Sequence, residues 1–296
     1  MPVGGQLCSS SAGWEAVYYI HAGITVYLFT LWVIFFKDTP HTHLWTSRRE
    51  VATIVKGKPS PVQKPPPYGK IVATPSVWAI GLASVANYFA MQLFVVFMPS
   101  YFHNALGFPI NHAGLLAALP VLAQFFVKLI GASLSDRCHF SSETTKVRIF
   151  NTIASLGAGI PLAVLAFTPK TEKWLSIGLL VLSAALLGFN SSGVFKSVSA
   201  VAREHSHLTV GLIQTMMCLS LAIWPFALSA LVQPTSDWSY VFGTIAILLN
   251  VSNALFVFLG KGSPAPWTHA ASSSPTAQST KIYPLDNGLP KAEIAS

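Results

Sequence analysis

Charged residues are scarce in this chain. Asp, Glu, Lys and Arg make up only 9% of its 296 residues, whereas apolar and aromatic types make up 52%. A soluble globular domain carries about 25% charged residues, so this chain has too few to cover a surface that faces water. The composition therefore predicts a membrane protein.

Cysteine is scarce as well, and the reactive residue types form no catalytic set. Cys8, Cys138 and Cys218 lie far apart and suggest neither a disulfide framework nor a zinc site. The sequence shows no nucleophile–base pattern, no phosphate-cradling loop and no metal-ligand cluster. We therefore expect no enzyme activity, no cofactor and no metal.

Long apolar segments, by contrast, are abundant. A membrane-spanning helix needs about 20 mainly apolar residues, and several of the qualifying segments contain proline, which membrane helices tolerate better than soluble ones. We predict an all-α membrane protein with seven transmembrane helices, at residues 14–36, 76–100, 113–134, 148–168, 174–195, 208–232 and 238–260.

The basic residues support this assignment. If the seven segments cross the membrane in alternating directions, fifteen Lys and Arg residues fall on one side of it. Seven lie in the loop 37–75, three after the third segment, two after the fifth and three in the tail. The other side receives only Lys170 and Lys173, and Lys128 lies inside a segment. Cytoplasmic loops carry such an excess of Lys and Arg. The net charge of +8 is thus explained without nucleic acid, which we do not expect as a partner.

The same partition gives the domain organisation. Residues 1–13 form an outer N-terminal segment, 14–36 a first helix and 37–75 a cytoplasmic loop. Residues 76–260 form a six-helix bundle, and the tail 261–296, rich in Ser, Ala and Pro, is expected to be a disordered cytoplasmic segment.

One motif stands at the cytoplasmic end of the third segment. GASLSDRC, from Gly131 to Cys138, ends a long apolar run in Asp136 and Arg137, and Arg148 begins the next helix. These residues suit a gating loop, a charge clamp that holds helix ends together in one state and releases them in another. The alternative is a solvated helix end in which Asp136 and Arg137 are simply exposed.

GASLSDRC, followed by Lys146-Val147-Arg148, resembles the cytoplasmic signature loop of the major facilitator superfamily, in the copy of its C-terminal half. The chain is similar in particular to the family of sialin, the vesicular glutamate transporters and the sodium–phosphate cotransporters. The family's spacing is matched by Gly13, Trp14, Tyr18, Tyr19, Asp38, Thr39, Pro40, His43, Ser47, Glu50 and Ile54. The resemblance extends over residues 4–260.

This resemblance implies that the seven helices correspond to helices six to twelve of a twelve-helix major facilitator fold. Helices one to four, which supply key charged residues for anion binding and proton coupling in that family, are expected to be missing. Two departures are notable. The family's Asp-Ile-Ala-Pro run is replaced by VSAVAREHS (198–206), and Asn87 stands where glutamate-transporting members have an arginine.

Four residues are candidate substrate contacts. The resemblance implies that Asn87 and Tyr88 on helix seven and Asn190 on helix ten line the central cavity; hydrogen bonding between helices is the alternative. Lys128 is a charge inside a span, and such charges are often functional. The alternative interpretation is that the Lys128 side chain extends along the helix and places its ammonium at the cytoplasmic surface.

The implied function is secondary transport of organic anions or phosphate, by rocking two halves around a midplane site. The expected partners are the lipid bilayer, a small anionic solute, sodium or a proton as coupling ion, and another transporter half. A non-transporting membrane protein that associates with or regulates a full-length transporter is the alternative. The sequence does not distinguish the plasma membrane from a vesicle or lysosome membrane.

Overall fold

The structure, a computed structural model, describes Gly4, Leu7 and residues 13–37, 46–47, 50–51, 67–137, 142–232 and 237–269. All regular secondary structure in these residues is helical. Six of its helical stretches are long and apolar enough to cross a membrane. This confirms the predicted all-α, integral, multi-pass membrane protein.

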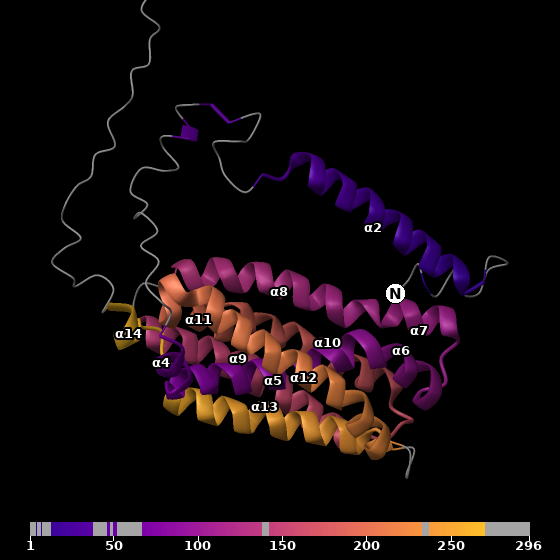
Figure 1. The fold of residues 1–296 in the computed structure, drawn as a ribbon. Helices are drawn as coiled ribbons and strands as arrows, with labels where there is room; N and C mark the ends of the chain where they lie inside the picture. Colours follow the sequence, from indigo (N-terminus) through magenta and orange to yellow (C-terminus); the bar gives the residue numbers. More distant parts are fainter. Residues whose placement is uncertain are drawn as a thin grey trace, which may run out of the picture.

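The first stretch, α2 (Glu15–Phe35), corresponds to the predicted span 14–36. It is apolar around its whole circumference, and none of its residues is buried. In Figure 1 it stands apart from the other helices. Trp14, immediately before it, is exposed, as expected of an aromatic residue at a membrane interface. The sides of α2 are therefore suited to lipid or to another apolar helix.

The second stretch contains a proline that interrupts its regular helical bonding. Pro99 has no backbone N–H to donate, and π-helical turns flank it on both sides. The elements in order are α5 (Pro75–Gln92), η2 (Leu93–Phe97), α6 (Met98–Ser100) and η3 (Tyr101–Ala105). A turn at Gly107, whose φ is +70°, leads into the third stretch. That stretch consists of α7 (Ile110–Leu116) and α8 (Ala118–Arg137).

The fourth and last stretches are α9 (Glu143–Ala166) and α13 (Ser239–Leu259), which pack side by side in opposite directions. Near the middle of α9, Asn151 Nδ2 donates to Asn253 Oδ1 over 2.8 Å. At its start, Arg148 Nε donates to the Gly260 carbonyl just beyond the end of α13, over 3.0 Å. The start of α9 thus lies beside the end of α13.

The remaining stretch, Lys173–Ala230, is 58 residues long and holds two predicted spans. A straight helix of that length would measure about 87 Å, roughly three times the thickness of the hydrocarbon core. The chain turns at Arg203, whose φ is 43°. The predicted division into two spans, and with it the count of seven, stays a prediction. The elements are α10 (Lys173–Leu187), η4 (Gly188–Ser191), α11 (Val194–Ala202), η5 (Arg203–His205) and α12 (Ser206–Val232).

Contacts between helices fix their directions. Gly81 faces the Met216 side chain, and the Phe89 and Trp224 rings lie 4.7 Å apart, so α5 and α12 run parallel. Gly188 lies against the Gln124 carbonyl, and Lys196 bonds Ser135, so the α10–α11 segment runs parallel to α8. Consecutive segments from α5 to α13 therefore alternate in direction.

This alternation gathers the cations at one end of the bundle. The end that holds α4 (Tyr68–Val72) and α14 (Pro266–His269) in Figure 1 carries the described cations Lys70, Arg137, Lys146, Arg148, Lys196, Arg203 and Lys261. The opposite end carries Lys170 and Lys173. By the positive-inside rule, we expect the first end to be the cytoplasmic one.

Residues 260–269, which we call the C-terminal strap, cross this cytoplasmic end. The Gly262 N–H donates to Thr144 Oγ1 over 3.0 Å, and the Trp267 indole N–H donates to Thr74 Oγ1 over 3.0 Å. Trp267 is buried. We expected a disordered tail from residue 261, and this is wrong for 261–269, because their apolar and backbone groups find partners on the bundle. Residues 270–296 lie outside the described residues.

Candidate functional site

A layer of asparagines crosses the bundle between two apolar cores. One core, which includes Ala90, Leu187 and Leu249, fills the outer part of the bundle, and the other, which includes Ile80, Val194 and Phe256, fills the cytoplasmic part. Between them, four buried asparagines lie on four different elements. We call Asn87, Asn151, Asn190 and Asn253 the asparagine layer. Amides this deep in a membrane bundle are costly unless they bond each other or a solute.

Asn87 occupies this layer on α5, near the middle of the helical stretch Pro75–Ala105. Its Nδ2 donates to the Ala83 carbonyl of its own helix over 2.7 Å. Its Oδ1 is buried and has no hydrogen-bond partner among the described residues. Tyr88, the next residue, is half-buried. The Asn87 amide therefore offers a free acceptor inside the bundle.

Asn190 occupies the layer on η4, where the helix between α10 and α11 is broken. Its side chain is buried and its Oδ1 also lacks a described partner. The two flanking glycines explain how this irregular turn fits. A Cβ on Gly188 would lie 2.8 Å from the Gln124 carbonyl oxygen of α8, and one on Gly193 would lie 2.7 Å from the Asn151 nitrogen of α9. Only glycine allows η4 to approach both helices this closely.

Lys128 lies on α8 at the same level as Asn87. Gln124 Nε2 lies 2.9 Å from Met91 Sδ and joins α8 to α5. Lys128 is one helical turn from Gln124 and Asn87 is one turn from Met91, both toward the same end of the bundle, so the two residues lie at a similar depth. Lys128 is half-buried, and no hydrogen bond or ion pair holds its ammonium within the described part of the chain. Its backbone nitrogen also borders Gly188.

Trp224 on α12 is a polar group near this level that we did not predict from the sequence. It is buried, and its indole N–H has no partner among the described residues. Its ring packs on Phe89, two residues after Asn87. A tryptophan in the middle of an apolar segment is a usable signal, because a buried indole N–H ordinarily finds an acceptor. Asn151 and Asn253 were missed as well.

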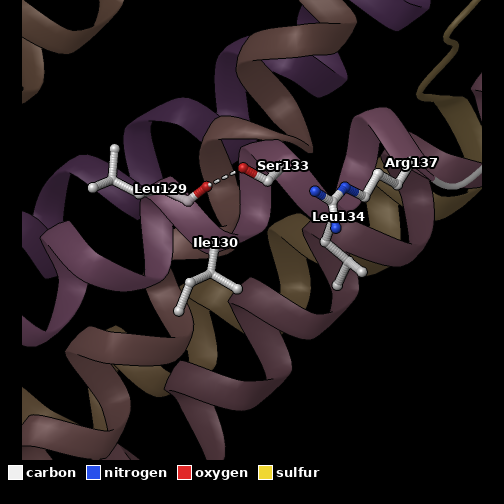
Figure 2. Close-up of a pocket in the computed structure, with 5 residues that line it drawn as sticks. All are labelled: Leu129, Ile130, Ser133, Leu134 and Arg137. Carbon is white, nitrogen blue, oxygen red and sulfur yellow. Dashed lines mark hydrogen bonds between the residues drawn. The ribbon is translucent and has the colours of Figure 1, made fainter.

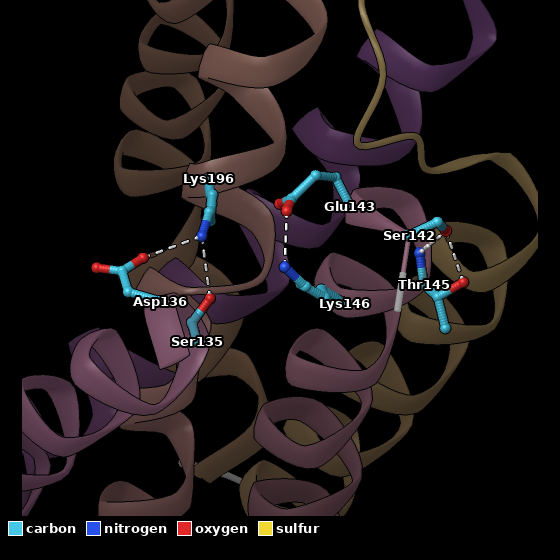
Figure 3. A network of polar contacts seen from close by, with 7 residues as sticks. All are labelled: Ser135, Asp136, Ser142, Glu143, Thr145, Lys146 and Lys196. Atoms are coloured by element: carbon cyan, nitrogen blue, oxygen red, sulfur yellow. Dashed lines mark hydrogen bonds and ion pairs between the residues drawn. The ribbon is translucent and has the colours of Figure 1, made fainter. Parts of the chain in front are cut away.

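The four gating-loop residues proposed from the sequence have separate contacts. Asp136 Oδ1 lies 3.2 Å from Lys196 Nζ of α11, and that ammonium also donates to Ser135 Oγ over 3.1 Å (Figure 3). A neighbouring pair, Glu143 and Lys146, is 2.7 Å apart within α9. The partner of Asp136 is thus Lys196, which we did not predict, and the clamp itself stays a proposal.

Gly131 and Arg148 lie in helix contacts. A Cβ on Gly131 would lie 2.9 Å from the Phe189 ring of η4, so the glycine lets α8 pack closely there. Arg148 donates to the Gly260 carbonyl and, over 3.3 Å, to the Phe258 carbonyl. These carbonyls form the negative end of α13, where a cation is stabilising. Arg148 therefore joins α9 to α13 and has no recorded contact with Asp136.

Arg137, the fourth residue, projects from α8 about 100° around the helix from Asp136. It lines a shallow hollow together with Leu129, Ile130, Ser133 and Leu134 (Figure 2). No hydrogen bond or ion pair of its guanidinium is recorded with any described residue. The sequence placed Arg137 in a clamp with its neighbour Asp136, but the two side chains leave the helix on different sides.

The asparagine layer with Lys128 and Trp224 presents hydrogen-bond donors and acceptors of the kinds that a small polar solute needs. The Lys128 ammonium and the Trp224 N–H are donors for an anionic group, and Asn87 Oδ1 and Asn190 Oδ1 are acceptors for hydroxyl or amine hydrogens. No group of three or more His, Cys, Asp or Glu residues suited to a metal occurs in the described part of the chain.

Comparison with known proteins gives a consistent set of relatives. The family model of the Major Facilitator Superfamily matches residues 1–225 and 81–287. The chain is 27% identical over 286 residues to vesicular glutamate transporter 1 of Xenopus tropicalis, covering 93% of this chain and 49% of that protein. It is 26% identical over 275 residues to sialin of Homo sapiens, covering 90% and 55%. The chain thus spans about half the length of the curated relatives it matches.

Proposed function

The chain belongs to the major facilitator superfamily, and we propose that it functions in secondary transport of a small organic anion across a membrane. The relatives that it resembles are named vesicular glutamate transporter and sialin. The observation that carries the proposal is Lys128, an ammonium without a described partner, at a similar depth to Asn87 and beside the η4 turn that bears Asn190. A charge in that position is expected to bind a solute of opposite sign.

The mixture of groups suits an organic anion that carries hydroxyl or amine groups. Asn87 and Asn190 each offer a buried carbonyl oxygen, and such an oxygen requires a donor on the solute. An acid that also carries hydroxyl or amine groups satisfies both the cation and these acceptors. We expect glutamate to be a weak substrate, because Asn87 stands where the glutamate-transporting members have an arginine.

Transport in this proposal follows the rocking of two halves around the midplane site. The described bundle supplies one half, and a second half, from the same or another chain, supplies the opposite wall. No Asp or Glu lies in the interior of the segments that form the bundle. Coupling to sodium or a proton therefore depends on groups in the other half.

Uptake into proteoliposomes tests the function. The full chain is reconstituted, and uptake of labelled glucuronate, glutamate and phosphate is compared with uptake by protein-free vesicles. We expect glucuronate flux above the background, and less flux for phosphate. If the folded chain transports none of the three, the transport proposal fails for this chain alone, and association with a full-length transporter becomes the better account.

A further inference from the structure

The C-terminal strap follows α13 and is bonded to the cytoplasmic ends of other helices. Its Lys261 carbonyl accepts a hydrogen bond from Ser197 Oγ of α11 over 2.6 Å. The Gly262 N–H donates to Thr144 Oγ1, in the first turn of α9, over 3.0 Å. The first part of the strap is therefore held by α9 and α11.

The second part of the strap reaches two further helices. The Ala265 N–H donates to the Val201 carbonyl near the end of α11 over 3.0 Å. The Trp267 indole N–H donates over 3.0 Å to Thr74, just before α5, and the indole ring lies 5.8 Å from the ring of His205, just before α12. The strap thus joins the cytoplasmic ends of α9 and α11 to those of α5 and α12.

The fit of the strap depends on a glycine and on one large apolar side chain. A Cβ on Gly262 would lie 2.5 Å from the Glu143 carbonyl oxygen and 2.7 Å from the Thr144 nitrogen, which are backbone atoms of α9. Trp267 is buried with Ala265 in the apolar core of the cytoplasmic part of the bundle. A methyl group on the glycine, or loss of the indole, should therefore loosen the strap and leave the helices themselves intact.

Two buried hydroxyl groups lie at this end of the bundle without a described partner. One is Ser76 Oγ in the first turn of α5, two residues after Thr74, and the other is Thr209 Oγ1 in the first turn of α12. Because α5 and α12 run parallel, the two hydroxyls lie at a similar depth. A buried hydroxyl without a partner is costly, and water that enters this end would satisfy both groups. They lower the cost of opening the cytoplasmic end.

We propose that the C-terminal strap is a releasable clamp on the cytoplasmic end of the bundle. When bound, it holds the starts of α5 and α12 against α9 and α11 and keeps water from the hydroxyls of Ser76 and Thr209. When released, it lets these helix ends separate and opens a path from the cytoplasm toward the asparagine layer. A short segment at the end of the bundle can detach while the helices stay folded. The clamp does not require that this chain transports a solute, so its test is independent of the transport assay.

The reactivity of a buried cysteine tests the clamp. Ser76→Cys is introduced into the full chain with its three native cysteines replaced by Ser. The new side chain is close to serine in size, and the serine hydroxyl that it replaces has no described hydrogen bond. The rate of modification by a small charged thiol reagent is measured by mass spectrometry in detergent. Ser183→Cys, at a buried position of α10 within the outer core, is the second reporter.

Release of the strap should expose the first reporter and not the second. We expect Trp267→Ala and Gly262→Ala each to raise the modification rate of Ser76→Cys at least about tenfold, because the rate follows the population of the released state and both changes remove contacts of the bound state. The rate of Ser183→Cys should stay the same in both variants.

Trp174→Ala and Gly211→Ala are the matched controls and should change neither rate. Trp174 is exposed at the outer end, and no atom would lie within 4 Å of a Cβ on Gly211. An unchanged Ser76→Cys rate in either strap variant would overturn the clamp. So would a Ser183→Cys rate that rises by the same factor, because the whole bundle would then be destabilised. If Trp267→Ala does not fold, Trp267→Phe, which keeps an aromatic ring without the N–H donor, should give a smaller increase, and no increase would count against the proposal.

Discussion

Lys196 on α11 holds the end of α8, because its ammonium lies 3.2 Å from Asp136 Oδ1 and 3.1 Å from Ser135 Oγ. This contact joins two segments that are 60 residues apart in the sequence. It lies at the cytoplasmic end, on the η4-bearing segment that also carries Asn190. We therefore expect a change in the ion pair to alter access to the asparagine layer from the cytoplasm.

Breaking this pair should change access more than stability. The Asp136 side chain is 79% exposed, and an exposed ion pair contributes at most about 1 kcal/mol. We expect Asp136→Asn to leave the unfolding temperature nearly unchanged. The same variant should speed labelling of an Asn190→Cys reporter by a thiol reagent applied from the cytoplasmic side, in a chain whose Cys8, Cys138 and Cys218 are replaced by Ser. The exchanged pair Asp136→Lys with Lys196→Asp should return the rate toward that of the parent, and a rate that stays high would argue against the clamp.

Gly188 should be sensitive to the addition of a single methyl group. A Cβ there would lie 2.8 Å from the Gln124 carbonyl and 3.1 Å from the Lys128 nitrogen, both of which are backbone atoms that cannot rotate away. We expect Gly188→Ala to destabilise the protein by about 1–3 kcal/mol, the usual range for overpacking. Thermal unfolding in detergent measures the loss.

Gly178, on the neighbouring helix α10, provides the matched control. No atom would lie within 4 Å of its Cβ, so Gly178→Ala should be neutral or stabilising by up to about 1 kcal/mol. If the two substitutions have the same effect, the close approach of η4 to α8 does not hold.

Acid should weaken the start of α13 through Asp237. The backbone N–H of Ser239 donates to Asp237 Oδ1 over 3.1 Å, and its hydroxyl donates to the same oxygen over 2.8 Å. The backbone bond first, and then the hydroxyl bond, lower the pKa of Asp237 from its ordinary value. A lowered folded-state pKa means that the stabilisation is complete above the unfolded pKa of about 4 and is lost as the pH falls through the folded value.

Unfolding temperatures measured between neutral pH and pH 3 check this dependence. We expect Asp237→Asn to remove the share of the pH-dependent fall in unfolding temperature that comes from Asp237. The variant should therefore lose less stability than the parent on acidification. An identical loss in both proteins would rule out the carboxylate as the titrating group.

The two ends of the bundle should react from opposite sides of the membrane. Single cysteines at Lys70 and Lys261 should be labelled by an impermeant thiol reagent from one side, and a cysteine at Lys170 only from the other side. The reason is that the helix directions put the first two residues at one end and the third at the opposite end. Labelling of Lys70→Cys and Lys170→Cys from the same side would contradict the alternation.

The helices were predictable because each depends on local composition. An apolar segment of about 20 residues with few charges is sufficient to predict a span, and α2, α9 and α13 begin and end within six residues of the predicted bounds. The resemblance to the major facilitator superfamily rested on motif order and is confirmed. The prolines inside the segments were compatible with membrane helices, but Pro99 gave no indication that π-helical turns would flank it.

The site was only partly predictable, because it depends on which helices meet and at what depth. Asn87, Asn190 and Lys128 stood out as polar groups in apolar segments. Their common level follows from the Gln124–Met91 contact and the approach of Gly188 to α8, neither of which is visible in the sequence. The ion pair between Lys196 and Asp136 and the burial of Trp267 in the strap are likewise long-range contacts that local patterns do not encode.

The central claim is that Lys128 binds the charge of an anionic solute, and equilibrium binding tests it most directly. Binding of glucuronate, and of glucose, which has no carboxylate, is measured by calorimetry on the purified chain and on Lys128→Gln, with Lys261→Gln as the control. We predict that glucuronate binds and glucose does not, and that Lys128→Gln weakens glucuronate binding at least about tenfold, as loss of a charged hydrogen bond implies. Equal binding of the two sugars, or an affinity unchanged in Lys128→Gln, would contradict the account.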